Sequence, residues 1–145
     1  PYLIITDEMT HALTLAAKRG VDVRIITPGI PDKKMVYSVT RSFYNSLVRN
    51  GVRIYEWTPG FCHAKMSVAD DCMATCGTIN LDYRSLYHHF ENGCFIVDHD
   101  IATQIHDDLR QVMNESCEVT EKYCSGRSAY LRLGQLFLRL FAELL

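Results

Sequence analysis

The stretch of sequence that decides the fold runs from His63 to Asn80 and reads HAKMSVADDCMATCGTIN. Its residues alternate in character up to Ala69, and a short apolar run from Cys72 to Cys76 follows the polar pair at positions 70 and 71. Alternation predicts a strand, and two strand-like runs separated by a short polar break predict a β-hairpin. We therefore expect a hairpin at the start of the stretch and a loop at its end.

Two segments of strand, helix and strand precede the hairpin. A short apolar run at residues 2–5 is followed by helix-spaced apolar positions up to Gly20, and then by the β-branched run Val21–Ile26. A helical pattern over residues 33–50 and a strand pattern over Val52–Trp57 repeat this arrangement. One face of this predicted helix carries the apolar residues Val36, Val39, Phe43 and Leu47. Such segments predict parallel strand pairs with right-handed crossovers. The expected fold class is α/β, with a mixed, largely parallel β-sheet flanked by helices.

The chain after the hairpin returns to a strand and ends in helical patterns. Strand character resumes from His89 to Val97, and helical spacing begins after Asp98. Residues 128–145 have the apolar and charged faces of an amphipathic helix, which we expect to dock on its own domain rather than on a membrane or a partner. With 145 residues and 48% hydrophobic content, residues 1–145 are expected to form a single domain.

Composition excludes several functional classes. A formal net charge of -2 gives no general attraction to nucleic acid or to anionic membranes, so anion binding has to be local. No apolar run reaches the ~18 residues of a transmembrane helix. Most of the six cysteines lie in apolar runs, and Cys72 and Cys76 are the only close pair. We therefore expect reduced, buried cysteines and no zinc site.

The hairpin brings together groups that handle a phosphate ester. On a strand, His63 and Lys65 point to the same side with Cα atoms about 7 Å apart, so one phosphate can contact both. We expect His63 to attack phosphorus and form a phosphohistidine, while Lys65, Thr78 and Asn80 bind the phosphate oxygens. This chemistry requires neither a metal nor a cofactor.

A carboxylate is the usual partner that orients an attacking histidine. Glu91 is our candidate, because it lies on a downstream strand among apolar neighbours. Asp70 is the rival, but it has the opposite strand parity to His63, so we expect it to fix the hairpin or to form a salt bridge. The alternative for the whole stretch is a surface strand followed by an ordinary turn, which would not require a histidine and a lysine on one face.

The spacing resembles the HKD signature of the phospholipase D superfamily, and the flanking residues are similar more narrowly to bacterial cardiolipin synthases. The resemblance implies a phospholipase D-like half domain in which Glu91 orients His63. It also makes Asp70 the aspartate of the motif, with a structural rather than a chemical part. The matching residues are His63, Lys65, Asp70, Gly77, Thr78 and Asn80, followed by Asn80-Leu81-Asp82-x-Arg84-Ser85-Leu86 and Phe90-Glu91, with further similarity over residues 16–24 and 59–65. The candidate catalytic residues are therefore His63, Lys65, Asp70 and Glu91, and the candidate phosphate ligands are Lys65, Thr78 and Asn80.

Cardiolipin synthases carry two such motifs, whereas this sequence contains one. Because the chain begins at Pro1 with an apolar strand pattern, we expect it to be the C-terminal half of a longer protein. The leading hypothesis is a phosphatidyltransferase that uses phosphatidylglycerol. The alternatives are a homodimeric phospholipase D, phosphodiesterase or nuclease with one motif per subunit, and an inactive structural or binding half. We expect the full protein to contact the cytoplasmic side of the cell membrane and the isolated chain to be soluble.

Overall fold

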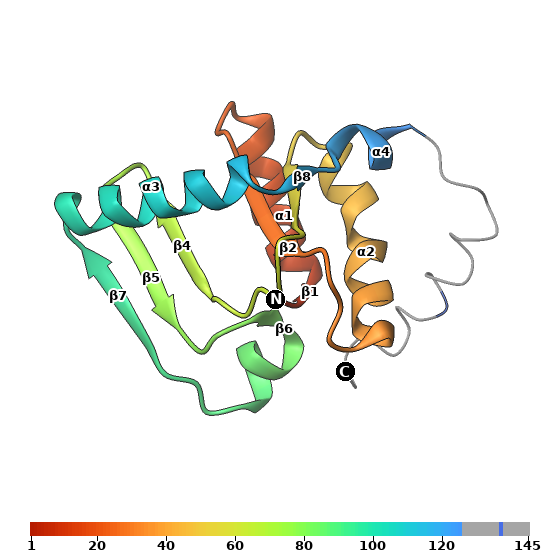
Figure 1. The fold of residues 1–145 in the computed structure, drawn as a ribbon, viewed down its shortest axis with the longest axis horizontal. Helices are drawn as coiled ribbons and strands as arrows, with labels where there is room; N and C mark the ends of the chain where they lie inside the picture. Colours follow the sequence, from red (N-terminus) through yellow and green to blue (C-terminus); the bar gives the residue numbers. More distant parts are fainter. Residues whose placement is uncertain (126–136, 138–145) are drawn as a thin grey trace.

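Strands and helices follow one another along the chain in a mixed α/β fold, as predicted (Figure 1). The computed structural model describes residues 1–125 and Phe137. The amphipathic helix expected over residues 128–145 therefore lies outside the described residues, apart from Phe137. The strands are β1 (Leu3–Ile4), β2 (Arg24–Pro28), β3 (Arg53–Trp57), β4 (Met66–Ala69), β5 (Met73–Gly77), β6 (Leu81–Asp82), β7 (Gly93–Val97) and β8 (Cys117–Glu118). The helices are α1 (Asp7–Lys18), α2 (Lys34–Val48), α3 (His99–Asn114) and α4 (Thr120–Cys124), with a π-helical turn η1 (Arg84–His88).

Parallel and antiparallel ladders both occur. β2 and β3 pair in parallel across α2, as the sequence predicts, and β8 joins the other edge of β3 in the antiparallel sense. The parallel pair expected between the first two strands does not form, because β1 pairs with β6 instead. β2 begins at Arg24 rather than at Val21, since the amide of Val21 bonds to the helix carbonyl of Ala16 at 3.1 Å.

The hydrophobic core forms around α2, whose predicted apolar face is the buried one. Val39 and Leu47 are fully buried and Phe43 nearly so. The face of α2 packs against β1, β3 and α4, which Figure 1 shows around the helix. In α4, which the sequence pattern did not reveal, Tyr123 meets the ring of Tyr44 edge-on at 4.8 Å between centroids. The core thus fixes the β1 and β3 side of the molecule, from which the chain leads into the hairpin.

The predicted hairpin is present as the antiparallel pair β4 and β5. Its turn residues Asp70 and Asp71 both have positive φ, at 52° and 51°, and the amide of Cys72 bonds to the carbonyl of Ala69 at 3.2 Å. β7 pairs with the other edge of β5, and α3 lies across all three strands (Figure 1). His106 of α3 hydrogen-bonds to the Asp71 carboxylate, so the helix anchors the turn.

The strand prediction was wrong at the start of the hairpin, where β4 begins at Met66 and leaves His63 and Lys65 before it. The amide of Gly77 still bonds to the carbonyl of Lys65 at 3.1 Å, which extends the pairing by one position. β5 ends at Gly77, and the amide of the next residue, Thr78, donates a hydrogen bond to the carbonyl oxygen of Asn92 at 2.8 Å. His63 therefore lies in the loop before the β4–β5 ladder and not on a strand.

Asp70 lies at the hairpin turn, five residues from Lys65 and about 16 Å along the strand at 3.3 Å per residue. We expect Asp70→Val to lower the free energy of unfolding by about 1–2 kcal/mol, because a β-branched residue is strained at positive φ. Asp70→Gly should change it by less than about 1 kcal/mol. Urea denaturation measures both values. A large loss of catalytic activity in a well-folded Asp70→Gly protein would contradict a purely structural part for Asp70.

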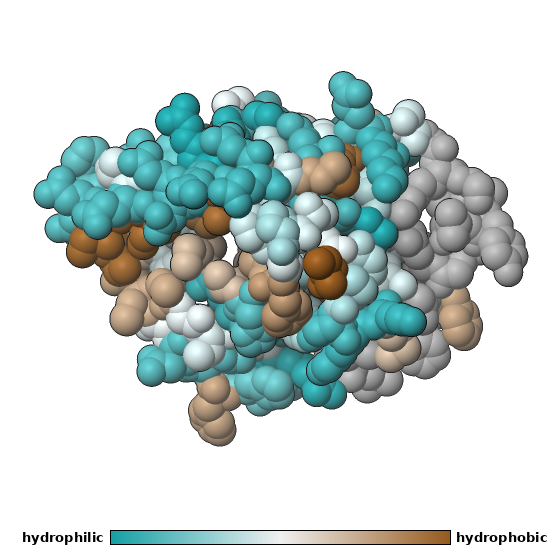
Figure 2. All heavy atoms as spheres, in the orientation of Figure 1, coloured by the Kyte–Doolittle hydropathy of each residue, from teal (hydrophilic) through white to brown (hydrophobic). Residues whose placement is uncertain are grey.

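The surface is largely polar but has an apolar region where β7 meets the start of α3 (Figure 2). Val97 is 71% exposed there, and Met73 and Ile101 are also exposed. Among the helices that the structure describes, none combines the length and the apolar character needed to cross a membrane.

Candidate active site

Three segments of the chain meet at the end of the hairpin away from its turn. They are residues 63–65 before β4, residues 77–80 from the last position of β5 onward, and residues 91–93 up to the first position of β7. A Cβ atom added to Gly77 would lie 2.3 Å from the carbonyl oxygen of Asn92 and 2.5 Å from the Cα of Gly93. Only glycine permits this close approach, so Gly77 serves to bring Thr78 against the segment that carries Glu91.

The His63 ring is held by two neighbours. The Lys65 ammonium lies 3.0 Å from each ring nitrogen and donates a hydrogen bond to the His63 carbonyl oxygen at 2.8 Å. The ring of Phe61 stacks on the other side, with centroids 5.6 Å apart. An ammonium has donors only, so it can bond to whichever ring nitrogen of a neutral imidazole carries no hydrogen, and a neutral imidazole is the form that can attack phosphorus.

Lys65 is a cation that is partly removed from water. Burial lowers its pKa below the ordinary value of 10.5, while the negative charges of Glu91 and Asp82 act in the opposite direction. Within residues 1–125, no carboxylate lies within ion-pair distance of its ammonium. The ammonium therefore remains available to the oxygens of an anionic ligand.

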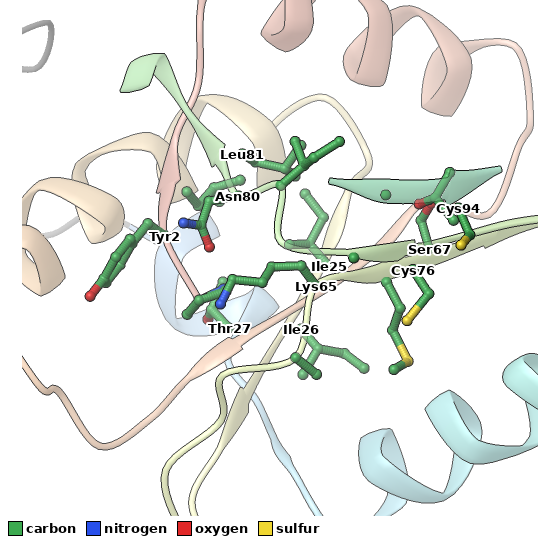
Figure 3. Close-up of a pocket in the computed structure, with 18 of the residues that line it drawn as sticks. Tyr2, Ile25, Ile26, Thr27, Lys65, Ser67, Cys76, Asn80, Leu81 and Cys94 are labelled. Atoms are coloured by element: carbon green, nitrogen blue, oxygen red, sulfur yellow. The ribbon is translucent and has the colours of Figure 1, made fainter. Parts of the chain in front are cut away.

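A cavity of about 370 Å³ opens beside Lys65. Figure 3 shows the side chains of Lys65 and Asn80 at one end of the cavity and Cys76 and Cys94 at the other. The Asn80 side-chain oxygen is buried and has no hydrogen-bond partner in the described structure. A buried acceptor without a partner is costly unless a ligand satisfies it. Apolar side chains form most of the wall, among them Ile25, Ile26, Ile79, Leu81 and Phe95.

Glu91 lies in the site, but its contacts differ from those expected. Its carboxylate accepts a hydrogen bond from the Thr78 hydroxyl and lies 3.8 Å from Nδ1 of His89. The ring of His63 bonds to Lys65 instead. The Thr78 hydroxyl has one hydrogen, and the Glu91 carboxylate is a nearer acceptor for it than the Asn92 carbonyl oxygen at 3.3 Å, so in this arrangement Thr78 holds the carboxylate and has no hydrogen left for a phosphate oxygen. That Glu91 orients His63 and that Thr78 binds phosphate stay predictions.

The hydroxyls of Thr78 and then Ser85 hold the pKa of Glu91 below its ordinary value of 4.5. We expect Thr78→Val to raise this pKa toward 4.5, measured by following the carboxyl carbon by NMR. A depressed pKa means that Glu91 favours the folded state above pH 4.5 and that this contribution is lost as pH falls through the folded-state pKa. Thr75→Val is the matched control, because Thr75 bonds to Ser67. An unchanged Glu91 pKa in Thr78→Val would contradict the contact.

Sequence reasoning missed the part that Asp82 and Ser85 play. Both are nearly buried, and the Asp82 carboxylate accepts a 2.7 Å hydrogen bond from the Ser85 amide at the start of η1. The spacing Asp82-x-x-Ser85 is typical of a side chain that caps a helical turn, so the sequence could have predicted this contact. This turn sets the course of the chain between Asn80 and Glu91.

Known protein families and curated proteins match most or all of the chain. A family model described as cardiolipin synthase, PLD-like domain, matches residues 1–113. Over all 145 residues the chain is 48% identical to an uncharacterized protein of Streptococcus mutans serotype c and 36% identical to cardiolipin synthase 2 of Bacillus cereus. It spans 32% and 28% of the lengths of these two relatives.

Two solved structures share the fold. The phospholipase D family member Nuc from Salmonella typhimurium superposes with a TM-score of 0.70 at 18% identity, over 81% of this chain and 76% of that one. Phosphatidylserine synthase from Haemophilus influenzae superposes with a TM-score of 0.69 at 20% identity, over 99% of this chain and 38% of that one.

Proposed function

The chain belongs to the cardiolipin synthase family of phospholipase D-like domains, and from this premise we propose that it supplies one of two half-sites of a phosphatidyltransferase. Phosphatidylglycerol is the donor, a hydroxyl of a second phosphatidylglycerol is the acceptor, and His63 carries the phosphatidyl group between them. The second half-site comes from another domain of the same motif, in the same chain or in a second copy.

The observation that carries this proposal is the cavity at Lys65 and Asn80. A cation and a carboxamide stand at one end of a cavity whose wall is mostly apolar. A phosphodiester with hydrocarbon attached fits both parts, because the ammonium binds phosphate oxygens and the apolar wall contacts the hydrophobic portion. A nucleic acid would instead require several cations along a groove, and the net charge of -2 does not favour that.

In the proposed reaction, a ring nitrogen of His63 attacks phosphorus and forms a P–N bond. The P–O bond to the glycerol headgroup breaks, and an acid from the second half-site gives the leaving oxygen its proton. A hydroxyl of the second phosphatidylglycerol then attacks phosphorus and loses its proton to the same group. The P–N bond breaks, its electron pair returns to the imidazole, and cardiolipin and glycerol are the products.

The Lys65 ammonium takes one position before phosphate binds and another afterwards in the proposed reaction. In the described structure its ammonium bonds to the His63 ring and carbonyl oxygen. When a phosphate enters, the ammonium turns to the non-bridging oxygens, where charge builds up in the transition state. The move frees the ring nitrogen for attack. Asn80 donates from its amide to the same phosphate, and its buried oxygen accepts a hydrogen bond from a substrate hydroxyl.

The sheet formed by β4, β5 and β7 exposes apolar side chains that a second half-site could cover. Phe95 and Val97 lie on one face of β7 and are 68% and 71% exposed. Exposed apolar side chains that adjoin one another on a sheet offer a surface that another protein segment can cover. A packed second half would shield this face and bring its acid toward His63.

The test uses protein that carries both half-sites and vesicles of phosphatidylglycerol. Thin-layer and mass-spectrometric analysis should find cardiolipin and free glycerol in equal amounts. Phosphatidic acid as the main product would show that water is the acceptor and would replace the transferase by a hydrolase. No conversion of the lipid by well-folded protein would contradict the proposed function altogether.

A further inference from the structure

Two of the six cysteines face each other across neighbouring strands. Cys76 of β5 and Cys94 of β7 are direct partners in the antiparallel register. Both are free and exposed, and both line the cavity, as Figure 3 shows. The sequence had predicted buried cysteines, and this was wrong for Cys72, Cys76, Cys94, Cys117 and Cys124, which are all exposed. The two thiols are therefore accessible to small molecules.

The ladder fixes the distance between these two residues. The amide of Thr78 bonds to the carbonyl of Asn92, and direct pairs alternate along an antiparallel ladder. Cys76 and Cys94 stand two positions further and belong to the same hydrogen-bonded type, for which Cα atoms are about 5.5 Å apart. A disulfide requires Cα atoms roughly 4.4–6.8 Å apart with side chains on the same face. The Cα separation thus lies within the range that a disulfide spans, and forming the bond requires the two Cβ atoms to move together from about 5 Å to about 4 Å, a small local adjustment of the two strands.

We propose that Cys76 and Cys94 form a reversible disulfide across β5 and β7 when the protein meets a low-molecular-weight disulfide. One cysteine thiolate attacks a sulfur of the small disulfide, which gives a mixed disulfide and releases one small thiolate. The other cysteine thiolate then attacks the protein-bound sulfur, forms the Cys76–Cys94 bond and releases the second small thiolate. The protein loses two electrons and two protons, and the small disulfide is reduced to two thiols.

The position of this pair gives the oxidation a consequence for the active site. Cys76 precedes Gly77 and Thr78, and Cys94 follows the segment that carries Glu91. A covalent link at this point ties together the two strands whose ends hold the Thr78 to Glu91 hydrogen bond. It also replaces two thiols in the cavity wall by one disulfide. Because exposed disulfides are the labile ones, a reducing thiol restores the original state.

The experiment treats the folded protein with oxidised glutathione and then alkylates the remaining thiols under denaturing conditions. Peptide mapping should find Cys76 linked to Cys94, with a mass lower by two hydrogen atoms, and dithiothreitol should restore both thiols. Cys94→Ser should leave Cys76 as a stable mixed disulfide with glutathione. Cys117→Ser is the matched control and should form the Cys76–Cys94 link normally.

Two results would overturn the proposal. One is a folded protein in which Cys76 and Cys94 each carry their own glutathione, because the second thiol then does not reach the first. The other is a pair that stays reduced while Cys72 and Cys124 react, because the two thiols are then inaccessible. Circular dichroism of each variant verifies that the fold is retained before oxidation.

Discussion

Replacing His63 with alanine is expected to lower the rate of phosphatidyl transfer by at least about 10³-fold, because the variant loses the imidazole that forms the proposed covalent intermediate. The ring of His63 is the one that Lys65 and Phe61 hold in place. The change should act on kcat, with binding of the lipid largely retained, since Lys65 and the apolar cavity wall remain. Steady-state kinetics on vesicles of varied lipid content separates the two effects.

Two further variants sharpen this prediction. His11→Ala is the matched control, because His11 lies on α1 with an exposed side chain, and it should leave the rate unchanged. Lys65→Met should also be impaired, since it keeps the length of the side chain and removes the charge that binds phosphate. A well-folded His63→Ala protein that transfers lipid at the wild-type rate would rule out His63 as the nucleophile.

The second large effect is expected on stability, at the ion pair between Arg41 of α2 and Glu56 of β3. The guanidinium donates two hydrogen bonds to the carboxylate, at 2.8 and 2.7 Å, and stacks on the ring of Tyr37 at 4.3 Å. The Glu56 side chain is 7% exposed and that of Arg41 is 21% exposed. Hydrogen bonds and charge from Glu56 outweigh the effect of burial and raise the pKa of Arg41.

We expect Arg41→Ala to lower the free energy of unfolding by about 3–5 kcal/mol, because it leaves the Glu56 carboxylate buried without a partner. Combining Arg41→Met with Glu56→Leu should recover much of this loss, since neither charge is then buried. Urea denaturation of Arg41→Met, of Glu56→Leu and of the double variant gives the coupling energy.

The ion pair between Arg24 and Asp22 provides the control, because its side chains are 36% and 53% exposed. Arg24→Ala should lower the free energy of unfolding by less than about 1 kcal/mol. Equal losses of unfolding free energy in Arg41→Ala and Arg24→Ala would mean that burial does not increase the contribution of the Arg41–Glu56 pair to stability.

Local patterns predicted much of the fold. The apolar spacing of Val36, Val39, Phe43 and Leu47 identified the buried face of α2, and alternation around the polar turn identified the hairpin. The pairing of β1 with β6 could not be predicted, because it joins two-residue strands that lie far apart in the sequence. The short segments β8 and α4 were missed for the same reason, since their place depends on β3 and Tyr44 rather than on local periodicity.

The sequence indicated which residues form the candidate site but not how their side chains are arranged. The spacing between His63 and Lys65 indicated that the two act together, and the structure places their side chains in contact. The sequence spacing could not indicate that β4 starts only after Lys65 or that the Thr78 hydroxyl is directed to Glu91. Both depend on where β5 ends and on the close approach that Gly77 permits. The Asn80 oxygen left without a partner is likewise a property of the folded cavity.

Trapping the covalent intermediate tests the central claim, that His63 carries the phosphatidyl group, most directly. Protein with both half-sites is mixed with phosphatidylglycerol, unfolded with denaturant at mildly alkaline pH and digested, because acid breaks the P–N bond of a phosphohistidine and strong base cleaves the acyl esters of the lipid. The phosphatidyl group should be found on the peptide that contains His63 and should be absent from His63→Ala. A phosphatidyl group on any other residue, including the histidine of the second half-site, would contradict the account.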